Sequence, residues 1–404
     1  MRLTIERLGH QGDGVAAGPV FVPRALPGEV VEGEVSGDRM EAPSIVTPSV
    51  DRRRAPCPHY AACGGCALQH ATDSFVESWK AGVVATALAG QGLDAPQRPV
   101  ATSPERSRRR ASLSARRTKT GAIVGFHGRA SGALVDLKDC ALLRPGLQDS
   151  LPLLRAVTIA GGSRKGELTL TISESESGVD LAVFGGKPME PALFSTLAAL
   201  AEGADLSRLT WEGEPVVTRR PPLQRFGRAL VAPPAGAFLQ ATKEGEAALL
   251  AAVREAIGPA RRVADLFAGA GTFSLPLAEK AEVHAAESEK PMMAALDLAY
   301  RQTPGLHRVT VEARDLFRRP LLPDELQRFN AVVLDPPRAG AEAQCRELAG
   351  STVPVIAYVS CNPVTFARDA RILSDAGWRI DWVQVIDQFR WSPHVELAAR
   401  LVRD

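Results

Sequence analysis

The strongest constraint on the fold is a regular alternation of short apolar runs and amphipathic segments from about residue 235 to the C-terminus. The apolar runs predict strands, and the segments between them predict helices. Strands are expected at 262–267, 282–287, 307–312, 330–335 and 353–360, and helices from Phe273 and over 290–302, 342–349 and 363–376. Segments 379–386 and 394–403 predict an antiparallel hairpin. Strands that alternate with helices build a doubly wound, mostly parallel α/β sheet, whose ligands bind at the carboxyl ends of the strands.

The chain before residue 235 predicts two further units and a connecting helix. Residues 1–55 contain short Val- and Ile-rich runs separated by turn signals such as HQGDGVA and LPGE, which is typical of a small OB-type β-barrel. Residues 74–89 predict a helix, with Ser74 and Glu77 as a capping box. Residues 101–234 contain the runs GAIVGFH, GELTLTIS and GVDLAVFGG and one helical stretch, PALFSTLAALAE, and predict an α+β central domain.

Composition restricts the compartment and leaves the partner open. With 45% apolar residues and a net charge of +2, global disorder is excluded. Neither a signal peptide nor an apolar stretch long enough to span a membrane is found, so we expect a cytoplasmic protein. Residues 101–130 carry eight basic side chains against one glutamate. Such a run is either a solvated loop or a surface that contacts nucleic-acid phosphates.

Four of the six cysteines form a candidate metal site. Cys57, Cys63 and Cys66 follow the spacing C-x5-C-x2-C, and Cys140 lies far downstream in LKDCALL. In a reducing compartment, cysteines indicate metal binding or catalysis rather than disulfides. Thiolates suit an iron–sulfur cluster or zinc, and the spacing alone leaves both open, together with unligated cysteines.

A glycine-rich turn follows the first predicted strand of the alternating region. The stretch VADLFAGAGTFSLPLA lets the backbone approach a ligand, and Glu287 at the end of the next strand can accept hydrogen bonds from a ribose. Asp315, after the following strand, is a candidate adenine contact. Dinucleotide-dependent dehydrogenases combine a glycine-rich turn and an acidic residue in the same way, but the third glycine of their fingerprint is missing here. A tight turn without a ligand is the alternative.

The remaining strand ends carry candidate reactive groups. Asp335 precedes two prolines in LDPPRAG, and Arg338 occupies the position where amino-group methyltransferases place an aromatic residue. Cys361 ends a core strand at a turn, where a structural cysteine is not expected. Glu396 opens the last strand; taken alone, it reads as a solvent-exposed charge. Its neighbour His394 reads as a core or capping histidine, and Cys345 as a small buried hydrophobic residue.

Taken in order, the motifs GAFLQATKEG, DLFAGAG, LDPPRAG, YVSCNPVTFARD and HVE, with the four cysteines, resemble the RNA uracil-C5 methyltransferases that carry an iron–sulfur cluster. The resemblance covers nearly the whole chain and is greatest to the 23S rRNA type. IERLGHQGDGVA and PGEVVEGEV resemble the TRAM domain of that family. Three departures are visible: Thr272 replaces a common Asn, FRWSPHVE replaces the usual Phe-Pro-x-Thr lead-in before His-Val-Glu, and the N-terminal barrel is compact.

The resemblance implies a class I (Rossmann-like) methyltransferase domain at 71–100 and 235–404. It also implies an RNA-binding TRAM/OB-like barrel at 1–55 and a central domain at 56–70 and 101–234. Cys57, Cys63, Cys66 and Cys140 would hold a [4Fe–4S] cluster. Cys361 would be the nucleophile and Glu396 the base. The S-adenosylmethionine site would be lined by Gln240, Phe267, Thr272, Glu287, Asp315 and Asp335.

The implied activity is methyl transfer to C5 of a uridine in RNA by a protein that acts as a monomer. The expected substrate is 23S rRNA. The T-loop of tRNA is the alternative substrate, and a non-catalytic RNA-binding iron–sulfur scaffold is the alternative of a different class.

Overall fold

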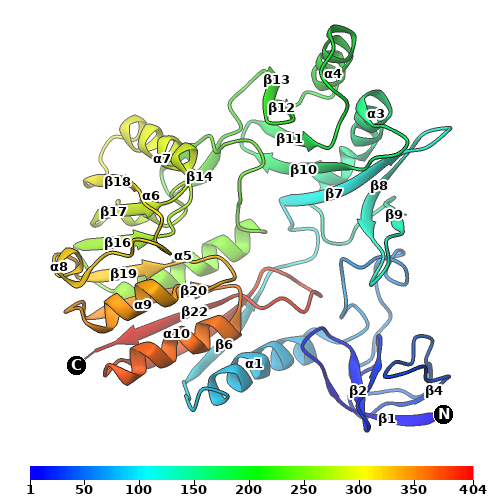
Figure 1. Cartoon of the computed structure of the whole chain (residues 1–404), viewed down its shortest axis with the longest axis horizontal. Helices are drawn as coiled ribbons and strands as arrows, with labels where there is room; N and C mark the ends of the chain where they lie inside the picture. Colours follow the sequence, from blue (N-terminus) through cyan, green and yellow to red (C-terminus); the bar gives the residue numbers. More distant parts are fainter. Residues whose placement is uncertain (404) are drawn as a thin grey trace.

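A computed structural model describes residues 1–403, which form three large β-sheets, a separate two-stranded sheet and the helices that cover them (Figure 1). The C-terminal sheet has eight strands in the order β18-β17-β16-β19-β20-β22-β21-β6. Its strands are β6 (Gln97–Thr102), β16 (Arg262–Leu266), β17 (Glu282–Glu287), β18 (Val309–Ala313), β19 (Ala331–Leu334), β20 (Val355–Ser360), β21 (Arg379–Asp387) and β22 (Leu397–Val402). Strands β16 to β20 run parallel, and β22 is antiparallel to both β20 and β21. The mostly parallel sheet and its closing hairpin are as predicted.

Helices cover both faces of this sheet. One face is packed by α5 (Lys243–Ile257), α6 (Ser274–Leu277) and α7 (Lys290–Gln302), and the other by α1 (Asp73–Ala89), α8 (Pro323–Leu326), α9 (Glu342–Ala349) and α10 (Pro363–Asp375). Successive strand residues serve opposite cores: Val333 packs in the first, and Val332 and Leu334 pack in the second. Because both faces are buried, the strands read as continuous apolar runs rather than as an alternating pattern.

The start of α1 differs from the sequence prediction. The N-cap is Thr72, without a side-chain cap, and the helix begins at Asp73. Ser74 Oγ donates to Thr72 Oγ1 over 3.4 Å, and Glu77 accepts from Thr102 Oγ1 of β6 at 2.8 Å. The predicted capping box is therefore wrong, because Glu77 ties α1 to the edge strand of the sheet.

The N-terminal unit is a five-stranded antiparallel sheet in the order β3-β2-β1-β4-β5. Its strands are β1 (Arg2–Leu8), β2 (Gly14–Ala16), β3 (Val20–Val22), β4 (Val30–Glu32) and β5 (Ser44–Thr47). A small core of Ile5, Val22, Val31 and Met40 holds it together. Since β3 and β5 are the edges of the sheet in the described chain, closure into a barrel stays a prediction.

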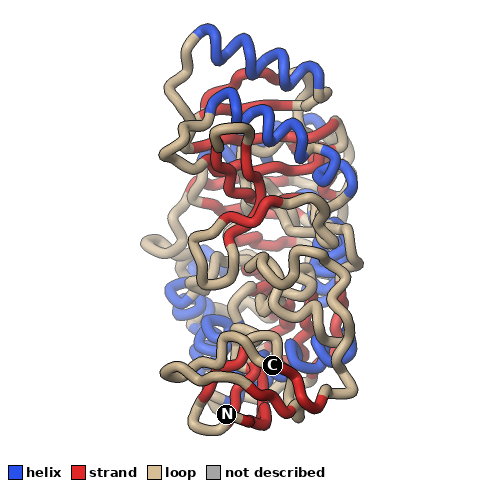
Figure 2. Tube along the Cα trace, turned by 90° about the vertical axis from the view of Figure 1, so that its right-hand side faces the viewer, coloured by secondary structure: helices blue, strands red, loops and turns tan. Residues whose placement is uncertain are grey.

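The central unit is a seven-stranded sheet in the order β13-β12-β11-β10-β7-β8-β9, antiparallel except between β11 and β12. Its strands are β7 (Arg110–Arg117), β8 (Ala122–His127), β9 (Leu134–Asp136), β10 (Leu168–Ser175), β11 (Gly178–Phe184), β12 (Arg208–Trp211) and β13 (Glu214–Thr218). The remaining elements of this region are α2 (Pro145–Asp149), α3 (Leu151–Gly161), α4 (Pro191–Gly203) and the hairpin β14 (Gln224–Phe226) and β15 (Ala229–Val231). The view of Figure 2 places α3 and α4 at one end of the molecule and both chain termini at the other.

No helix within residues 1–403 combines the length and the apolar character needed to cross a membrane.

Candidate active site

The carboxyl ends of the parallel strands open into a cavity of about 870 Å³. All eight residues that the sequence predicts to be catalytic or cofactor-binding line it. They are Gln240, Phe267, Thr272, Glu287, Asp315, Asp335, Cys361 and Glu396. The structure thus brings together residues separated by more than 150 positions, while their individual roles stay predictions.

The glycine-rich turn after β16 is shaped by its backbone. Phe267 and Gly271 have φ of +65° and +96°, and a Cβ on Gly271 would lie 2.9 Å from Leu296 of α7. Only glycine fits there, which lets the turn pack directly on the helix. Glu287, at the end of β17, accepts from the backbone N–H of Gly269 at 3.2 Å. The acidic side chain and the turn therefore meet, as a ribose site requires.

Aromatic side chains flank the next part of the cavity. The rings of Phe267 and Phe317 lie 5.5 Å apart, centroid to centroid, at an angle of 57°. Asp315 accepts from the backbone N–H groups of Phe317 and Arg318 at 3.0 and 3.3 Å, which fixes its carboxylate at the same rim. This apolar slot with an adjacent carboxylate suits a purine ring.

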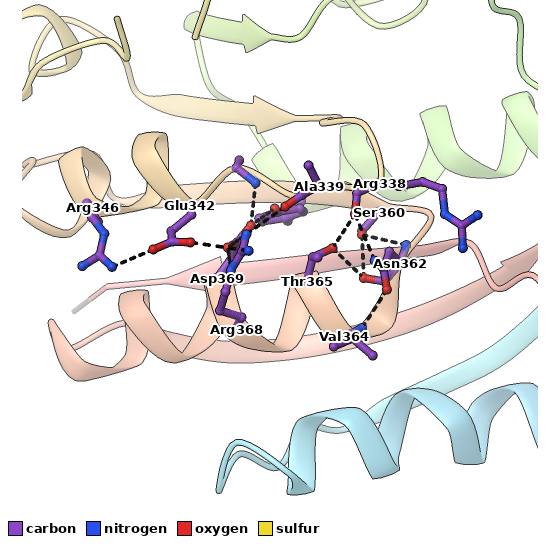
Figure 3. Close-up of polar contacts among 12 residues, drawn as sticks. Arg338, Ala339, Glu342, Arg346, Ser360, Asn362, Val364, Thr365, Arg368 and Asp369 are labelled. Atoms are coloured by element: carbon purple, nitrogen blue, oxygen red, sulfur yellow. Dashed lines mark hydrogen bonds and ion pairs between the residues drawn. The ribbon is translucent and has the colours of Figure 1, made fainter. Parts of the chain in front are cut away.

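Cys361 follows β20 directly. Hydrogen bonds among Ser360, Asn362, Thr365 and Arg338 hold the turn on either side of it (Figure 3). Asn362 caps α10 by accepting from Val364 N at 3.1 Å, and its Nδ2 donates to the carbonyl of Arg338 at 2.9 Å. Thr365 Oγ1 donates to the same carbonyl at 3.2 Å. The loop that carries the two prolines is therefore tied to the turn that carries Cys361.

A buried carboxylate completes this corner. Asp369 of α10 is fully buried and accepts from the backbone N–H of Ala341 and from the hydroxyl of Tyr358, both at 2.6 Å (Figure 3). These bonds join α10, β20 and the end of the Pro-Pro loop. Cys345 is fully buried in the core beside them, as predicted, and is not exposed to the cavity.

The cavity disfavours the ionised forms of its acidic side chains. Burial and the charges of Asp265 and Glu287 raise the pKa of Asp335 to about 7. Burial and the charge of Asp335 raise the pKa of Glu396 to about 8. Glu396 is only 3% exposed, so its interpretation as a solvent-exposed charge is wrong.

The same charges act on the thiol. Burial, followed by the charges of Glu396 and Asp335, raises the pKa of Cys361 to about 11, while Arg338 lowers it. Because the cavity disfavours the charged forms of three acidic groups, it favours a ligand that carries a positive charge.

Sequence reasoning missed three contributors to this region. Phe238, 63% exposed, and Arg108 both line the cavity, and Gln388 stands behind it. Phe238 lies in the motif GAFLQATKEG, of which only Gln240 was assigned to the donor site, and Arg108 lies in the basic run. Gln388 could not be recognised from the sequence, because a single neutral amide matches no motif.

His394 is exposed at the cavity rim, so the prediction that it is buried in the core is wrong.

The four predicted metal-binding cysteines surround a second, smaller cavity of about 50 Å³. All four are free thiols. Burial, with the charges of the other three, raises the pKa of Cys66 to about 12. Within residues 1–403, no group of three or more His, Cys, Asp or Glu side chains is arranged to hold a metal ion, so the cluster stays a prediction. Arg108 lines this cavity as well as the larger one.

The basic run is largely structural. Arg109 is 1% exposed and paired with Glu246, and Arg110 donates to the carbonyls of Ala237 and Gly236, both at 3.0 Å. Arg106, Arg116 and Arg129 pair with Asp139, Glu167 and Asp13 at 3.0, 3.1 and 2.8 Å. The prediction of a phosphate-contacting surface is therefore wrong for Arg109, which has no access to a ligand.

Comparison with known proteins places the chain among RNA methyltransferases. Residues 233–404 match the family model described as tRNA (uracil-5-)-methyltransferase. An uncharacterized RNA methyltransferase of Brucella suis is 44% identical over 405 residues, covering 100% of this chain and 98% of the relative. The 23S rRNA (uracil(1939)-C(5))-methyltransferase RlmD of Halomonas elongata is 34% identical, covering 98% and 88%.

A solved structure shares the fold over its whole length. The Pyrococcus abyssi tRNA (uracil-54, C5)-methyltransferase, in complex with S-adenosyl-L-homocysteine, matches with a TM-score of 0.77. The sequences are 24% identical, and the match covers 100% of this chain and 99% of the other.

Proposed function

This chain belongs to the family of RNA (uracil-5-)-methyltransferases, and from that premise we propose that it methylates C5 of a uridine in 23S rRNA. The methyl donor is S-adenosylmethionine. The choice of 23S rRNA is supported by the RlmD relative, which spans nearly the whole chain. A uridine in the T-loop of tRNA is the alternative, and the description of the matching family model supports tRNA as the substrate.

The observation that carries the mechanism is the shared cavity of Cys361, Glu396 and the six predicted donor-site residues. Uracil C5 is a weak nucleophile. The Cys361 thiolate adds to C6, and the electron pair of the C5–C6 double bond moves to give an enolate that is nucleophilic at C5. C5 then attacks the methyl group of the sulfonium, and the bond between that methyl group and sulfur breaks. S-adenosylhomocysteine, which is neutral at sulfur, is released.

Elimination completes the reaction. Glu396 accepts the proton from C5, the C5–H electron pair restores the double bond, and the Cys361 thiolate leaves C6. The target base must leave its stack to reach the cavity, as with other enzymes that modify bases. The sulfonium charge also favours the thiolate, because it offsets the anions that raise the Cys361 pKa.

RNA binding is assigned to the N-terminal sheet, as a TRAM/OB-like barrel, together with a groove that leads to the active site. The groove is lined by Arg7 and His10 of the N-terminal unit, Trp79 of α1, and Arg338 beside Cys361. Basic and aromatic side chains are the groups that bind phosphates and unstacked bases. The protein is expected to act in the cytoplasm as a monomer.

The four cysteines are proposed to hold a [4Fe–4S] cluster. The support for this proposal is that four free thiols surround one cavity. The backbone N–H of Gly65 points to Cys63 Sγ at 3.4 Å, and Arg108 supplies a positive charge. When bound, the cluster supplies redox-active iron held by thiolates; here its expected contribution is to fix the loop 57–66 against Cys140.

A methyl-transfer assay tests the proposed function. The protein, labelled S-adenosylmethionine and transcripts of 23S rRNA or tRNA should yield 5-methyluridine in the rRNA. Cys361→Ala should abolish it, and Cys345→Ala, in the buried core, should not. In Glu396→Gln, methyl transfer should occur but elimination should stall, which leaves a protein–RNA adduct that survives denaturing electrophoresis. Product in tRNA alone would select the alternative substrate, and no product in any RNA would refute the proposal.

A further inference from the structure

A directed hydrogen-bond chain runs behind the wall of the catalytic cavity. It starts at Gln388, directly after β21. The backbone N–H of Ala241 donates to Gln388 Oε1 at 2.7 Å. Since an N–H group can only donate, this bond fixes which end of the Gln388 amide is the carbonyl and turns its amino group the other way.

The amino group of Gln388 serves two residues of the cavity wall. Its Nε2 donates to Glu396 Oε2 at 3.1 Å and to Gln240 Oε1 at 2.6 Å. The Gln240 amide is thereby oriented in turn, and its Nε2 points to Asp335 Oδ2 at 3.4 Å. Gln388, Gln240 and Glu396 are each 3% exposed or less. Asp335 and Glu396, two of the carboxylates that line the cavity, are thus linked through two amides of defined orientation.

The backbone on either side of Gln388 is held by a buried lysine. Lys80 of α1 donates from Nζ to Asp387 Oδ1 at 2.6 Å and to the carbonyl of Phe389 at 3.2 Å. Lys80 and Asp387 are 0% and 1% exposed. A fixed backbone and a fixed amide leave Gln388 little freedom to turn.

The motif QATKEG accounts for the other side of the contact. It supplies Gln240, the N–H of Ala241 and the N-cap Thr242 of α5. It also supplies Gly245, where a Cβ would come within 2.6 Å of the Gln388 Cβ. Only a glycine in the first turn of α5 lets Gln388 reach its partners.

We propose that Gln388 is a positioning residue for proton abstraction, holding Glu396 so that its carboxylate faces the C5 proton of the methylated base. The inference rests on the proposed function and adds a residue that touches neither base nor cofactor. Gln388 acts through Glu396, to which it donates, and through Gln240, whose amide it orients.

The charges in the cavity determine in which direction the pKa of Glu396 changes when the hydrogen bond from Gln388 is lost. The titratable or charged side chains that line the cavity together with Glu396 come from several segments: Asp335 after β19, Cys361 after β20, Glu287 and Glu289 at and after the end of β17, Arg314 and Asp315 after β18, Arg338, His394 and Arg108. Burial and Asp335 raise the pKa of Glu396, and the hydrogen bond from Gln388 lowers it. Removing that bond raises the pKa further, so the ionised base exists only at higher pH.

The test compares wild type with Gln388→Met and Gln388→Glu. The methionine is of similar size and cannot donate. It should slow adduct decay about 10- to 100-fold at neutral pH, which is the cost expected for a hydrogen bond to a charged group. Its pH profile for adduct decay should move to higher pH. The glutamate variant adds a second carboxyl beside Glu396 and should move the profile further.

Two measurements separate positioning from damage to the fold. S-adenosylmethionine affinity should fall much less than the rate of adduct decay, because Gln388 reaches the donor site only through the Gln240 amide. Gln384→Met, the same change at a more exposed position of β21, should leave both the rate and the profile unchanged. NMR of isotope-labelled glutamate, assigned with Glu396→Gln, should show a higher Glu396 pKa in Gln388→Met without any turnover.

The outcomes are distinct. A wild-type decay rate and pH profile in Gln388→Met, with methylation intact, would overturn the inference and leave the proposed function standing. A slower rate with an unmoved profile and an unmoved Glu396 pKa would also overturn it, since general loosening of the site then suffices. Absence of 5-methyluridine from the wild-type reaction would refute the proposed function and the inference together.

Discussion

Binding of S-adenosylmethionine should release protons, because the empty cavity holds carboxyl groups that are partly protonated near neutral pH. The pKa of Asp335 is raised to about 7 and that of Glu396 to about 8. At pH 7.5, about a quarter of the Asp335 carboxyls and about three quarters of the Glu396 carboxyls therefore carry a proton. A cation placed between them stabilises the ionised forms and expels these protons.

The size of the effect follows from Coulomb's law. A sulfonium charge at a separation of about 5 Å, in an effective dielectric constant of about 20, attracts a carboxylate by about 3 kcal/mol. That energy corresponds to a fall of roughly two pKa units. Both carboxyls would then be ionised at pH 7.5, so about one proton should leave for each molecule bound.

Calorimetry in buffers of different ionisation enthalpy measures this number directly. S-adenosylhomocysteine is the matched ligand, because it lacks only the methyl group and its charge, and it should release much less. Glu396→Gln should reduce the release to about a quarter of a proton at pH 7.5. Equal proton release by the two ligands, or none by either, would refute the electrostatic description of the cavity.

Three further predictions concern the rest of the molecule. Arg109→Ala should lower the free energy of unfolding by about 3–5 kcal/mol in denaturant titrations, because it leaves Glu246, whose side chain is 13% exposed, without its partner. Lys119→Ala, at an exposed position of the same run, should change it by less than about 0.5 kcal/mol. Equal effects of the two substitutions would contradict a stabilising role for the Arg109–Glu246 pair. Burial raises the pKa of Asp265 to about 7, so its stabilising contribution is full below pH 4 and is lost as the pH rises through 7. Asp265→Asn should therefore become more favourable than wild type by up to about 1.4 kcal/mol for each pH unit between 4 and 7, and a pH-independent difference in thermal unfolding would contradict this sign. Anaerobically purified protein should contain about four irons and four sulfides. Cys140→Ser should lose them, Cys361→Ser should keep them, and stoichiometric zinc without sulfide would contradict the cluster.

The parts of the site that the sequence could predict are those that follow from strand order. Residues at the carboxyl ends of parallel strands meet at one rim whatever their side chains do. Phe267, Glu287, Asp335 and Cys361 could therefore be assigned to one region from the alternation of strands and helices alone. The apolar runs were recognisable because both faces of the sheet are buried.

Other features depend on contacts that local patterns do not encode. The basic run resembled an exposed surface because its local sequence does not show which acidic residues its side chains pair with. Glu246, the partner of Arg109, lies 137 positions downstream. The prediction of a capping box was wrong because Glu77 accepts a hydrogen bond from Thr102, which lies in a strand 25 residues later in the chain. The role of Gln388 was invisible for the same reason: Gln240, its partner in the amide chain, lies 148 positions away.

The proton-accepting end of the site is assembled from three segments that are distant in the chain. Lys80 fixes the backbone around Gln388, QATKEG orients the Gln388 amide, and that amide holds Glu396. A buried ion pair such as Lys80 with Asp387 is weak evidence for stability, because desolvation offsets most of the attraction. Its geometry is nevertheless restrictive, since one ammonium group must satisfy Asp387 and Phe389 at once. The helix that precedes the central unit in sequence is thereby part of the catalytic domain's machinery, because without α1 the segment that carries Gln388 would lose its buried anchor.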